Sequence, residues 1–428
     1  RSRRFLVLYA ASHFTSEVQV LDLTEPASEW RLVRPRVAGQ EYDLEHRGDQ
    51  FLIRINDRGG NFRVISVPVA NPTAEGVELL PHRDDVAVEG VESFARFWVA
   101  WERSAGLPRI RITTVPTNEV RYVVFDEAVY DASPDFNREW ETDTLRYRYE
   151  SFVTANSVYQ YEVASGRSTL LKRKEVLGDY DPSRYHSERV MAQAADGTAI
   201  PISLVRRRDQ GPASASPMYL TAYGAYGMPY PVTFTSNRLA LLDRGVSFAV
   251  AHVRGGGEMG RAWHDGGRLA HKENTFTDFI ACADHLFAIG RTRPNQLAIE
   301  GGSAGGLLIG AVLNLRPDLC TAALLEVPFV DVINTMRDAS LPLTIGEYEE
   351  WGNPAVEEQY CWIRDYCPYT NLAPKDYPAM LVRASLNDSQ VMYWEPAKYV
   401  ARLRTLRTDA RPLVMLTNLG AGHSGASG

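Results

Sequence analysis

The sequence predicts two fold classes in one chain: an all-β domain, followed by an α/β domain with a doubly wound, mostly parallel sheet. Up to about residue 182, short runs of β-branched and aromatic residues alternate with turn residues, and long helical periodicity is nearly absent. From residue 183 onward, strand-like apolar runs alternate with segments whose apolar residues recur at helical spacing. We therefore expect two domains, residues 1–182 and residues 183–428.

The first domain is expected to be a β-propeller. Strands are predicted at residues 5–9, 18–23, 51–55, 62–67, 97–101, 110–115, 122–125 and 158–163. Similar units recur at a spacing of roughly 40–50 residues, the period of a four-stranded propeller blade, and about four such units fit this part of the chain. A sandwich of two stacked sheets is the alternative that the pattern leaves open.

The second domain begins with a hairpin signal, Asp196-Gly197 between two apolar runs. Further strands are predicted at residues 218–223, 246–253, 296–300, 322–327 and 379–384, and helices at residues 276–289 and 395–406. Such alternation of strands and helices predicts a largely parallel sheet covered on both faces.

The composition of the chain argues against several classes of binding partner. The chain has 428 residues, of which 45% are hydrophobic and 23% charged, and a formal net charge of −7. A mildly acidic protein has no overall field that attracts nucleic acid or an anionic membrane. The four cysteines have no zinc or disulfide spacing, and no apolar run approaches the ~20 residues needed to cross a bilayer. We expect a cytoplasmic protein without a metal ion, a nucleic-acid partner or a membrane partner.

One motif carries chemistry: Gly301-Gly302-Ser303-Ala304-Gly305-Gly306, between a predicted strand and the helical residues 307–315. The pattern G-x-S-x-G at such a junction is typical of the nucleophile of an α/β-hydrolase domain, because a sharp turn lifts the hydroxyl above the sheet edge. Ser303 is thus the candidate nucleophile. The backbone N–H of Ala304, at the start of the helix, is the candidate oxyanion donor.

A serine needs a base and an acid, which follow it in the order Asp/Glu, then His, in this fold class. Asp388 comes directly after the predicted strand at 379–384, and His423 lies in Gly420-Ala421-Gly422-His423 after the apolar residues 413–416. A lone loop aspartate or histidine is usually a cap or a solvated surface residue. Here the order and the placement after strands favour catalysis.

Gly255-Gly256-Gly257-Glu258-Met259-Gly260 fits the dinucleotide-binding pattern G-x-G-x-x-G, but the residues after it do not form an apolar helix. We interpret it instead as a loop near the hydrolase site. No phosphate-binding or metal-ligating motif is found, so no cofactor is expected.

These motifs resemble the prolyl oligopeptidase family, and most closely its oligopeptidase B branch. The resemblance is carried by Tyr223-Gly224-Ala225-Tyr226-Gly227, His252-Val253-Arg254-Gly255-Gly256-Gly257-Glu258, the serine motif, Val327-Pro328-Phe329-Val330-Asp331-Val332, Gly346-Glu347-Tyr348-Glu349-Glu350-Trp351-Gly352-Asn353-Pro354, Asn387-Asp388-Ser389-Gln390-Val391 and Ala421-Gly422-His423. It runs through essentially all of residues 183–428 and is looser before them.

The resemblance implies a catalytic triad of Ser303, Asp388 and His423. It further implies that the hydroxyl of Tyr223 completes the oxyanion hole with the Ala304 N–H, and that Tyr226 and Gln390 contact the substrate.

In the oligopeptidase B branch, the glutamates that correspond to Glu347 and Glu349 receive a P1 arginine or lysine. Two carboxylates in a partly desolvated pocket would favour such a cationic side chain. The alternative is that Glu347, Glu349 and Glu350 form a solvated acidic run.

The chain also departs from the family. Residues 228–234 contain no acidic residue of the kind that helps relatives to bind a basic P2 residue. The family's propeller usually has seven blades, and a C-terminal helix follows its histidine. We therefore expect part of the propeller and that helix to be missing at the two ends of this sequence.

The resulting prediction is a serine oligopeptidase, monomeric or homodimeric, that hydrolyses short peptides after Arg or Lys through an acyl-enzyme. A prolyl- or dipeptidyl-peptidase-like hydrolase is the alternative within enzymes, although the tryptophan that stacks on a P1 proline is missing at its expected place. A propeller binding module with an inactive hydrolase domain is the alternative of another class.

Overall fold

The computed structural model describes residues 2–211 and 215–425, which divide into two compact units. Unit 1 contains the chain up to Gly178 together with two short segments, Pro231–Phe234 and Met259–Ala262. Unit 2 contains Asp179–Tyr230, Thr235–Glu258 and the chain from Trp263 onward. All the predicted site residues belong to unit 2.

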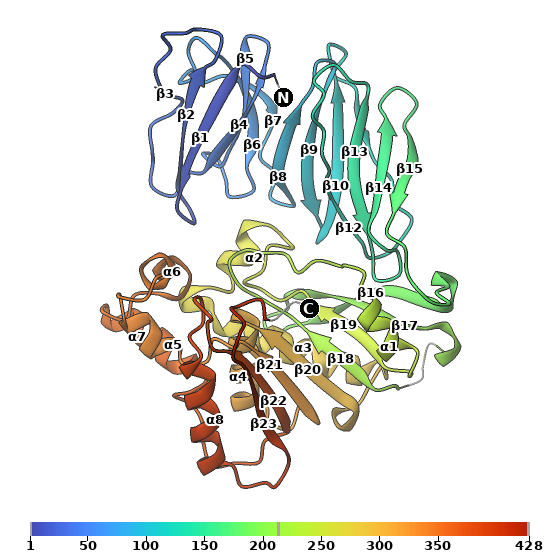
Figure 1. Cartoon of the computed structure of the whole chain (residues 1–428), viewed down its shortest axis with the longest axis vertical. Helices are drawn as coiled ribbons and strands as arrows, with labels where there is room; N and C mark the ends of the chain where they lie inside the picture. The colour runs from blue at the N-terminus through green and yellow to red at the C-terminus, as the bar shows by residue number, and fades with distance from the viewer. Residues whose placement is uncertain (1, 212–214, 426–428) are drawn as a thin grey trace. The chain divides into compact units, whose positions relative to one another are not determined.

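Unit 1 consists of four antiparallel sheets that follow one another along the described chain (Figure 1). The first sheet contains β1 (Phe5–Ala11), β2 (Ser16–Asp22) and β3 (Arg31–Leu32). The second contains β4 (Tyr42–Arg47), β5 (Gln50–Ile55), β6 (Arg63–Pro68) and β7 (Val77–Leu80). The third contains β8 (Val86–Ser93), β9 (Phe97–Ser104), β10 (Leu107–Thr114) and β11 (Val120–Tyr122). The fourth contains β12 (Asp131–Pro134), β13 (Thr144–Glu150), β14 (Ser157–Glu162) and β15 (Arg167–Arg173).

The packing between these sheets distinguishes a propeller from a sandwich. One buried cluster joins Val18 and Val20 of the first sheet to Phe51 of the second. Another joins Leu52, on the opposite face of the second sheet, to Trp98 of the third, and a further cluster joins the third sheet to the fourth. Each inner sheet therefore packs on both of its neighbours in chain order, as blades do. The propeller prediction is confirmed.

Most strands predicted in unit 1 are present, but the one predicted at residues 122–125 is wrong. The strand there, β11, ends at Tyr122. Val123 still donates a backbone hydrogen bond to the carbonyl of Ile110, at 3.1 Å, but the chain then leaves the sheet. The apolar run continues because Val123 is buried in the core between the third and fourth sheets. A buried loop residue thus resembles a strand residue in the sequence.

Unit 2 is built on one sheet of eight described strands in the order β16-β17-β19-β18-β20-β21-β22-β23. Its strands are β16 (Tyr185–Gln193), β17 (Ala199–Arg207), β18 (Met218–Thr221), β19 (Ser247–Ala251), β20 (Leu297–Gly302), β21 (Ala322–Glu326), β22 (Ala379–Ser385) and β23 (Leu413–Asn418). The hairpin β16–β17 is antiparallel and also pairs antiparallel with β19, whereas the neighbours from β19 to β23 are parallel. This is the predicted α/β-hydrolase type of sheet, with an antiparallel hairpin at one edge.

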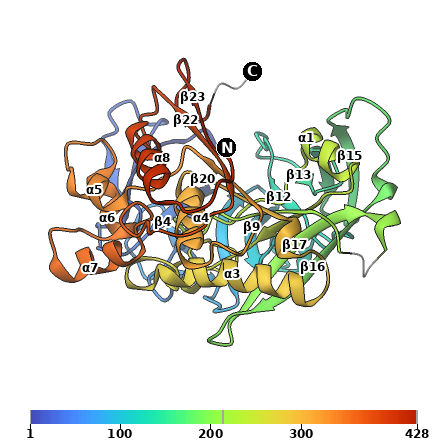
Figure 2. The same ribbon diagram turned by 90° about the horizontal axis from the view of Figure 1, so that it is seen from below.

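Helices lie on both sides of this sheet, as Figure 2 shows for α1 on one side and α3 on the other. The described helices after residue 178 are α1 (Ser236–Leu242), α2 (Arg261–Asp265), α3 (Glu273–Ala288), α4 (Ala304–Leu315), α5 (Val332–Arg337), α6 (Thr344–Trp351), α7 (Glu357–Tyr366) and α8 (Trp394–Leu406), with single 3₁₀ turns η1 (Pro182–Arg184), η2 (Arg208–Gln210), η3 (Leu269–His271) and η4 (Pro294–Gln296). The first two residues of α2 belong to unit 1. The central helix α4 is buried along nearly its whole length.

Coverage of the sheet is not complete. On β22 and β23, the side chains of Leu381, Val414 and Leu416 are exposed and share one face, because Leu381 pairs with Val414 in register. In the described part of the chain, this face of β22 and β23 is exposed, while the predicted doubly wound sheet is present. No helix of that part is long and apolar enough to cross a membrane.

Candidate active site

Ser303 occupies the tight turn between β20 and α4, in a backbone conformation that few side chains adopt. Its φ is 53° and its ψ is −119°. Strain of this kind persists only where the surroundings fix it, and here the end of β21 and the loop after it do so. The Ser303 N–H donates to the carbonyl of Glu326 at 2.9 Å, and its own carbonyl accepts from the N–H of Phe329 at 3.1 Å. The turn is the elbow that the motif predicts.

The glycines around Ser303 are required because other parts of the chain pack directly against their Cα atoms. A Cβ at Gly301 would lie 2.2 Å from the carbonyl oxygen of Gly305, and one at Gly306 would lie 2.4 Å from the side chain of Pro328. Both distances are far shorter than a carbon contact allows, so α4 can begin directly under the serine only because these positions lack a side chain.

The oxyanion candidates lie on either side of Ser303. Ala304 is the first residue of α4, where the backbone N–H groups have no acceptor within the helix. Burial raises the pKa of the Tyr223 hydroxyl, and the neighbouring Ser303 side chain offsets part of the rise. Tyr223 therefore stays a neutral donor, which is the form that can stabilise a developing oxyanion.

Asp388 and His423 meet after β22 and β23. The His423 Nδ1 lies 2.8 Å from Oδ2 of Asp388, and the Asp388 side chain is fully buried. Its other oxygen accepts the backbone N–H groups of Gln390 and Val391, both at 2.9 Å. Since a carboxylate only accepts hydrogen bonds, Nδ1 carries the proton and Nε2 is left as the basic nitrogen.

The loops that carry the acid and the base are joined to each other by their backbones. The pairing of β22 with β23 extends to Ser385 and Asn418. Beyond it, the N–H of Leu386 donates to the carbonyl of Asn418 at 2.9 Å, and the N–H of Asn387 donates to that of Ala421 at 3.1 Å. The parallel edge pair thus fixes the approach of the histidine to the aspartate. A cavity of about 430 Å³ opens beside His423, at the ends of β21, β22 and β23.

Two chains of contacts lead from Ser303 to Glu347. In the first, Tyr223 packs near Tyr226 with ring centroids 6.2 Å apart, and the Tyr226 hydroxyl donates to Oε2 of Glu347 at 2.8 Å. In the second, the ring of Phe329 lies 5.6 Å from that of Trp351, whose Nε1 donates to the same oxygen at 2.8 Å. Ser303 and Glu347 are therefore linked through aromatic residues.

The other two predicted substrate residues, Glu349 and Gln390, do not take part in these contacts. Glu349 is two positions from Glu347 on α6, so the two side chains leave different faces of the helix. Oε2 of Glu349 is buried and has no hydrogen-bond partner in the described part of the chain. The side chain of Gln390 is exposed, and only its backbone N–H is tied to the site, through Asp388.

Sequence reasoning missed four residues of this region: Trp351, Glu350, His264 and Lys272. Trp351 is fully buried, and its ring packs edge-to-face on Tyr226 at 5.6 Å. Its spacing of four residues from Glu347 was the available signal, because that spacing places both side chains on one helix face. The other three are polar residues from two distant segments, His264 and Lys272 from one and Glu350 from the other, and no local pattern predicts that they are buried together.

The glycine-rich segment that resembled a dinucleotide motif has a steric role beside the site. A Cβ at Gly255 would lie 2.2 Å from the carbonyl oxygen of Gly224, and one at Gly257 would lie 2.0 Å from that of Gly227. The N–H of Gly227 also donates to the carbonyl of Gly255 at 3.0 Å. The glycines allow two backbone segments to pack against each other, next to Tyr223.

A second Ser–His–Glu row exists in unit 2, but it is buried. Ser203 Oγ lies 2.7 Å from Nε2 of His252, whose Nδ1 lies 3.2 Å from Oε1 of Glu258. All three residues are at most 5% exposed. Glu258 also accepts the backbone N–H of Tyr230 at 2.8 Å, so the row links β17 to the residue directly after β19 and to two loops. Because no substrate can reach Ser203, we interpret this row as structural.

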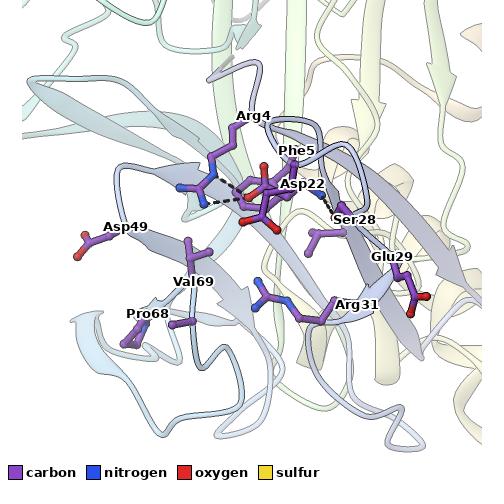
Figure 3. Close-up of a pocket in the computed structure, with 12 residues that line it drawn as sticks. Arg4, Phe5, Asp22, Ser28, Glu29, Arg31, Asp49, Pro68 and Val69 are labelled. Carbon is purple, nitrogen blue, oxygen red and sulfur yellow. Dashed lines mark hydrogen bonds and ion pairs between the residues drawn. The ribbon is translucent and has the colours of Figure 1, made fainter.

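Unit 1 has a cavity of its own, of about 440 Å³, whose lining residues Figure 3 shows. Arg4 is paired there with Asp22 at 2.9 Å, and the hydroxyl of Ser28 accepts the backbone N–H of Asp22 at 3.1 Å. The described side chains contain no group of three or more His, Cys, Asp or Glu residues placed to hold a metal ion.

Comparison with known proteins decides the family. Residues 232–428 match the model of the prolyl oligopeptidase family, and residues 1–174 match that of the prolyl oligopeptidase N-terminal β-propeller domain. The chain belongs to the prolyl oligopeptidase family. Together the two models account for most of its length.

Individual relatives agree with this assignment. The chain is 44% identical to dipeptidyl aminopeptidase BI of Pseudoxanthomonas mexicana, with all of the chain and 59% of that protein aligned. It is 38% identical to protease 2 of Moraxella lacunata, with all of the chain and 62% of that protein aligned. A solved structure of oligopeptidase B from Trypanosoma brucei with covalently bound antipain superposes with a TM-score of 0.94, at 41% identity, over 99% of the chain and 62% of that protein. The chain thus spans about three fifths of the length of these relatives.

Proposed function

We propose that this protein is a serine oligopeptidase that hydrolyses short peptides after arginine or lysine. The observation that carries the proposal is the run of neighbouring side chains from Ser303 through Tyr223 and Tyr226 to the carboxylate of Glu347. It would combine the proposed nucleophile, the proposed oxyanion donor and a carboxylate in one region of unit 2.

The chemistry assigns one role to each group. Nε2 of His423 accepts the proton of the Ser303 hydroxyl while the oxygen attacks the scissile carbonyl, and Asp388 orients the imidazole and stabilises its charged form. The Tyr223 hydroxyl and the Ala304 N–H donate to the oxyanion of the tetrahedral intermediate. The imidazolium then protonates the leaving amine, which gives an acyl-enzyme on Ser303. Water, activated by His423, hydrolyses this ester.

Two carboxylates support a basic P1 residue. Glu347 lies against the aromatic walls formed by Tyr226 and Trp351, and Glu349 has a buried oxygen without a hydrogen-bond partner in the described part of the chain. A guanidinium can pair with carboxylates through charge-assisted hydrogen bonds, and its stem can lie along the rings. A neutral P1 side chain such as proline would leave the buried oxygen of Glu349 without a hydrogen-bond partner.

A dipeptidyl aminopeptidase is the second candidate, because the relative with 44% identity carries that name. Both candidates use the same nucleophile and differ in whether the free amino terminus of the substrate is required. An inactive hydrolase domain attached to a binding propeller, the alternative of another class, predicts no hydrolysis of any substrate.

The test compares chromogenic amides with arginine, lysine or proline at P1, each with a blocked and with a free amino terminus. The proposal predicts that blocked arginyl and lysyl amides are cleaved and that the prolyl amide is cleaved at least about 10-fold more slowly. Cleavage only of dipeptidyl amides with a free amino terminus would favour the second candidate. Faster cleavage of the prolyl amide would contradict the assignment of the pocket.

A further inference from the structure

Lys272 is a buried ammonium that the proposed mechanism does not use. It is 2% exposed, and its Nζ lies 2.6 Å from the carbonyl oxygen of Gly224 and 3.1 Å from that of Gly267. The ammonium also lies over the ring of Trp351, 4.8 Å from its centroid. Burial lowers the pKa of Lys272 to about 8, and the nearby charge of Glu350 opposes this shift. A lysine is rarely buried to this extent, so the site has to offset a substantial desolvation cost.

Glu350 is the matching buried anion, on helix α6. It is 2% exposed; Oε1 accepts the backbone N–H of Tyr226 at 3.0 Å, and Oε2 lies 2.7 Å from Nε2 of His264. Burial opposes ionisation of Glu350, but the hydrogen bond with His264 and the charge of Lys272 hold its pKa below the ordinary value. The carboxylate is therefore ionised and accepts both bonds.

Lys272 and Glu350 hold the same short segment, residues 223–227, which we call the 223–227 turn. The ammonium binds the carbonyl of Gly224, and the carboxylate binds the N–H of Tyr226. The turn has a positive φ at Gly224, Tyr226 and Gly227, with values of 68°, 61° and 62°. At Tyr226 this conformation is strained, and strain persists only where the surroundings impose it.

The 223–227 turn carries both ends of the proposed site. Tyr223, at its start, lies beside the Ser303 side chain, and the Tyr226 hydroxyl donates to Glu347. A shift of the turn by a fraction of an ångström would therefore change the donor at the oxyanion and the wall of the pocket at once.

We propose that Lys272 and Glu350 are positioning residues, which fix the 223–227 turn so that the Tyr223 hydroxyl lies at the position of the developing oxyanion. The inference rests on the oxyanion role of Tyr223 in the proposed function. On this proposal, Lys272 stabilises the transition state by holding Tyr223 in place, and its role is not limited to stabilising the protein core. A methionine would fill a similar volume without a buried charge, so a role confined to the core would leave catalysis unchanged.

The test is a double-mutant cycle on blocked arginyl amide hydrolysis with Tyr223→Phe, Lys272→Met and the double variant. We expect Tyr223→Phe to lower kcat by about 10²-fold or more, as expected for the loss of one oxyanion donor, and Lys272→Met to lower kcat by about 10-fold or more with little change in KM. The double variant should be no more than about 3-fold slower than Tyr223→Phe, because Lys272 has no hydroxyl left to position.

Lys375→Met is the matched control. Its Nζ also donates to a backbone carbonyl, that of Asn314, at 2.6 Å, and lies 5.9 Å from the ring centroid of Tyr377, but it does not contact the 223–227 turn. We expect its kcat to stay within about 2-fold of the unmodified protein, in line with sites that act independently.

Different results separate the inference from the function on which it rests. The positioning role is overturned, and the oxyanion role survives, in either of two cases in which Tyr223→Phe has a low kcat. In the first, the kcat losses of the two single variants multiply in the double variant. In the second, Lys272→Met keeps full kcat. If Tyr223→Phe keeps full kcat, the oxyanion role itself is overturned, and the inference with it. Should Lys272→Met not fold, Glu350→Gln takes its place in the same cycle, with the same non-additivity expected.

Discussion

The Nδ1 atom of His423 lies 2.8 Å from Oδ2 of Asp388, and the other oxygen of this buried carboxylate is held by two backbone N–H groups. This single interaction sets both the tautomer and the orientation of the histidine. It also connects two loops that 35 residues of sequence separate.

Replacing Asp388 with asparagine should remove this control with little change in shape. The amide can present its NH₂ group to His423, which favours the wrong tautomer, and we expect kcat to fall by about 10⁴-fold with an almost unchanged KM. Steady-state hydrolysis of an arginyl amide checks this. Asp365→Asn, at an exposed ion pair on α7, is the control and should retain full activity. A loss below 10-fold for Asp388→Asn would contradict the assignment.

The pocket carboxylates should control the choice of substrate. Glu347→Gln keeps a carbonyl oxygen to accept the bonds from Tyr226 and Trp351 but removes the charge. We expect kcat/KM for an arginyl amide to fall by about 10- to 100-fold, and that for an amide with a neutral P1 residue to change little, because only the charged hydrogen bond is lost. Glu349→Gln should act in the same direction.

The control for the pocket is Glu358→Gln, an exposed glutamate at the start of α7, which should leave both substrates unaffected. An equal loss on arginyl and neutral substrates in the Glu347 variant would show a general role for this glutamate instead of a role in specificity.

The buried row Ser203–His252–Glu258 should affect stability without affecting the chemistry. Ser203→Ala removes the partner of His252 Nε2 at 2.7 Å in a buried site, so we expect the free energy of unfolding to fall by about 1–3 kcal/mol. Denaturant unfolding followed by fluorescence measures this change. The kcat of the folded variant should equal that of the unmodified protein, in contrast to Ser303→Ala, and a large loss of kcat would mean that the row reaches the active site.

Glu395 predicts a dependence of stability on pH. This fully buried carboxyl on α8 accepts bonds from Thr335 and from the backbone N–H of Asp331, and burial raises its pKa to about 7. The folded protein then holds a proton that the unfolded chain releases near its ordinary pKa of 4.5. Its contribution to the free energy of unfolding is therefore complete below about pH 4.5 and is lost as the pH rises through 7.

Replacing Glu395 with glutamine should flatten this dependence. We expect the loss of stability between pH 5 and pH 7.5 to be about 1–3 kcal/mol smaller in the variant than in the unmodified protein. Urea unfolding at several pH values measures it, and Glu357→Gln, at an exposed position of α7, is the control. The same slope in the Glu395 variant would show that another group titrates.

The sequence allowed the fold to be predicted wherever a strand is a continuous apolar run. It failed at β13 (Thr144–Glu150), where Leu145, Tyr147 and Tyr149 are buried and arginines alternate with them. Buried and exposed residues alternate along β13 because one face of the strand lies in the core and the other does not. The arginines on the exposed face interrupt the apolar run by which the other strands were predicted. Candidate site residues that lie in motifs, such as Ser303, could also be predicted from the sequence.

The polar residues that surround the motif could not be predicted. Glu350 belongs to an acidic run that is usually solvated, yet it is buried because His264 and Tyr226, which are distant in the sequence, supply its partners. Only the three-dimensional contacts distinguish it from Glu349, whose buried oxygen has no hydrogen-bond partner in the described residues. Burial of a charge depends on partners from other elements, and no local pattern records them.

The most direct test of the account is to label the folded protein with a fluorophosphonate probe and to locate the adduct by mass spectrometry of the digested protein. The account predicts one stable adduct, on Ser303, and a labelling rate that falls sharply in His423→Ala because the base is lost. An adduct on Ser203, or no adduct on Ser303 in protein whose fold is verified by circular dichroism, would contradict it.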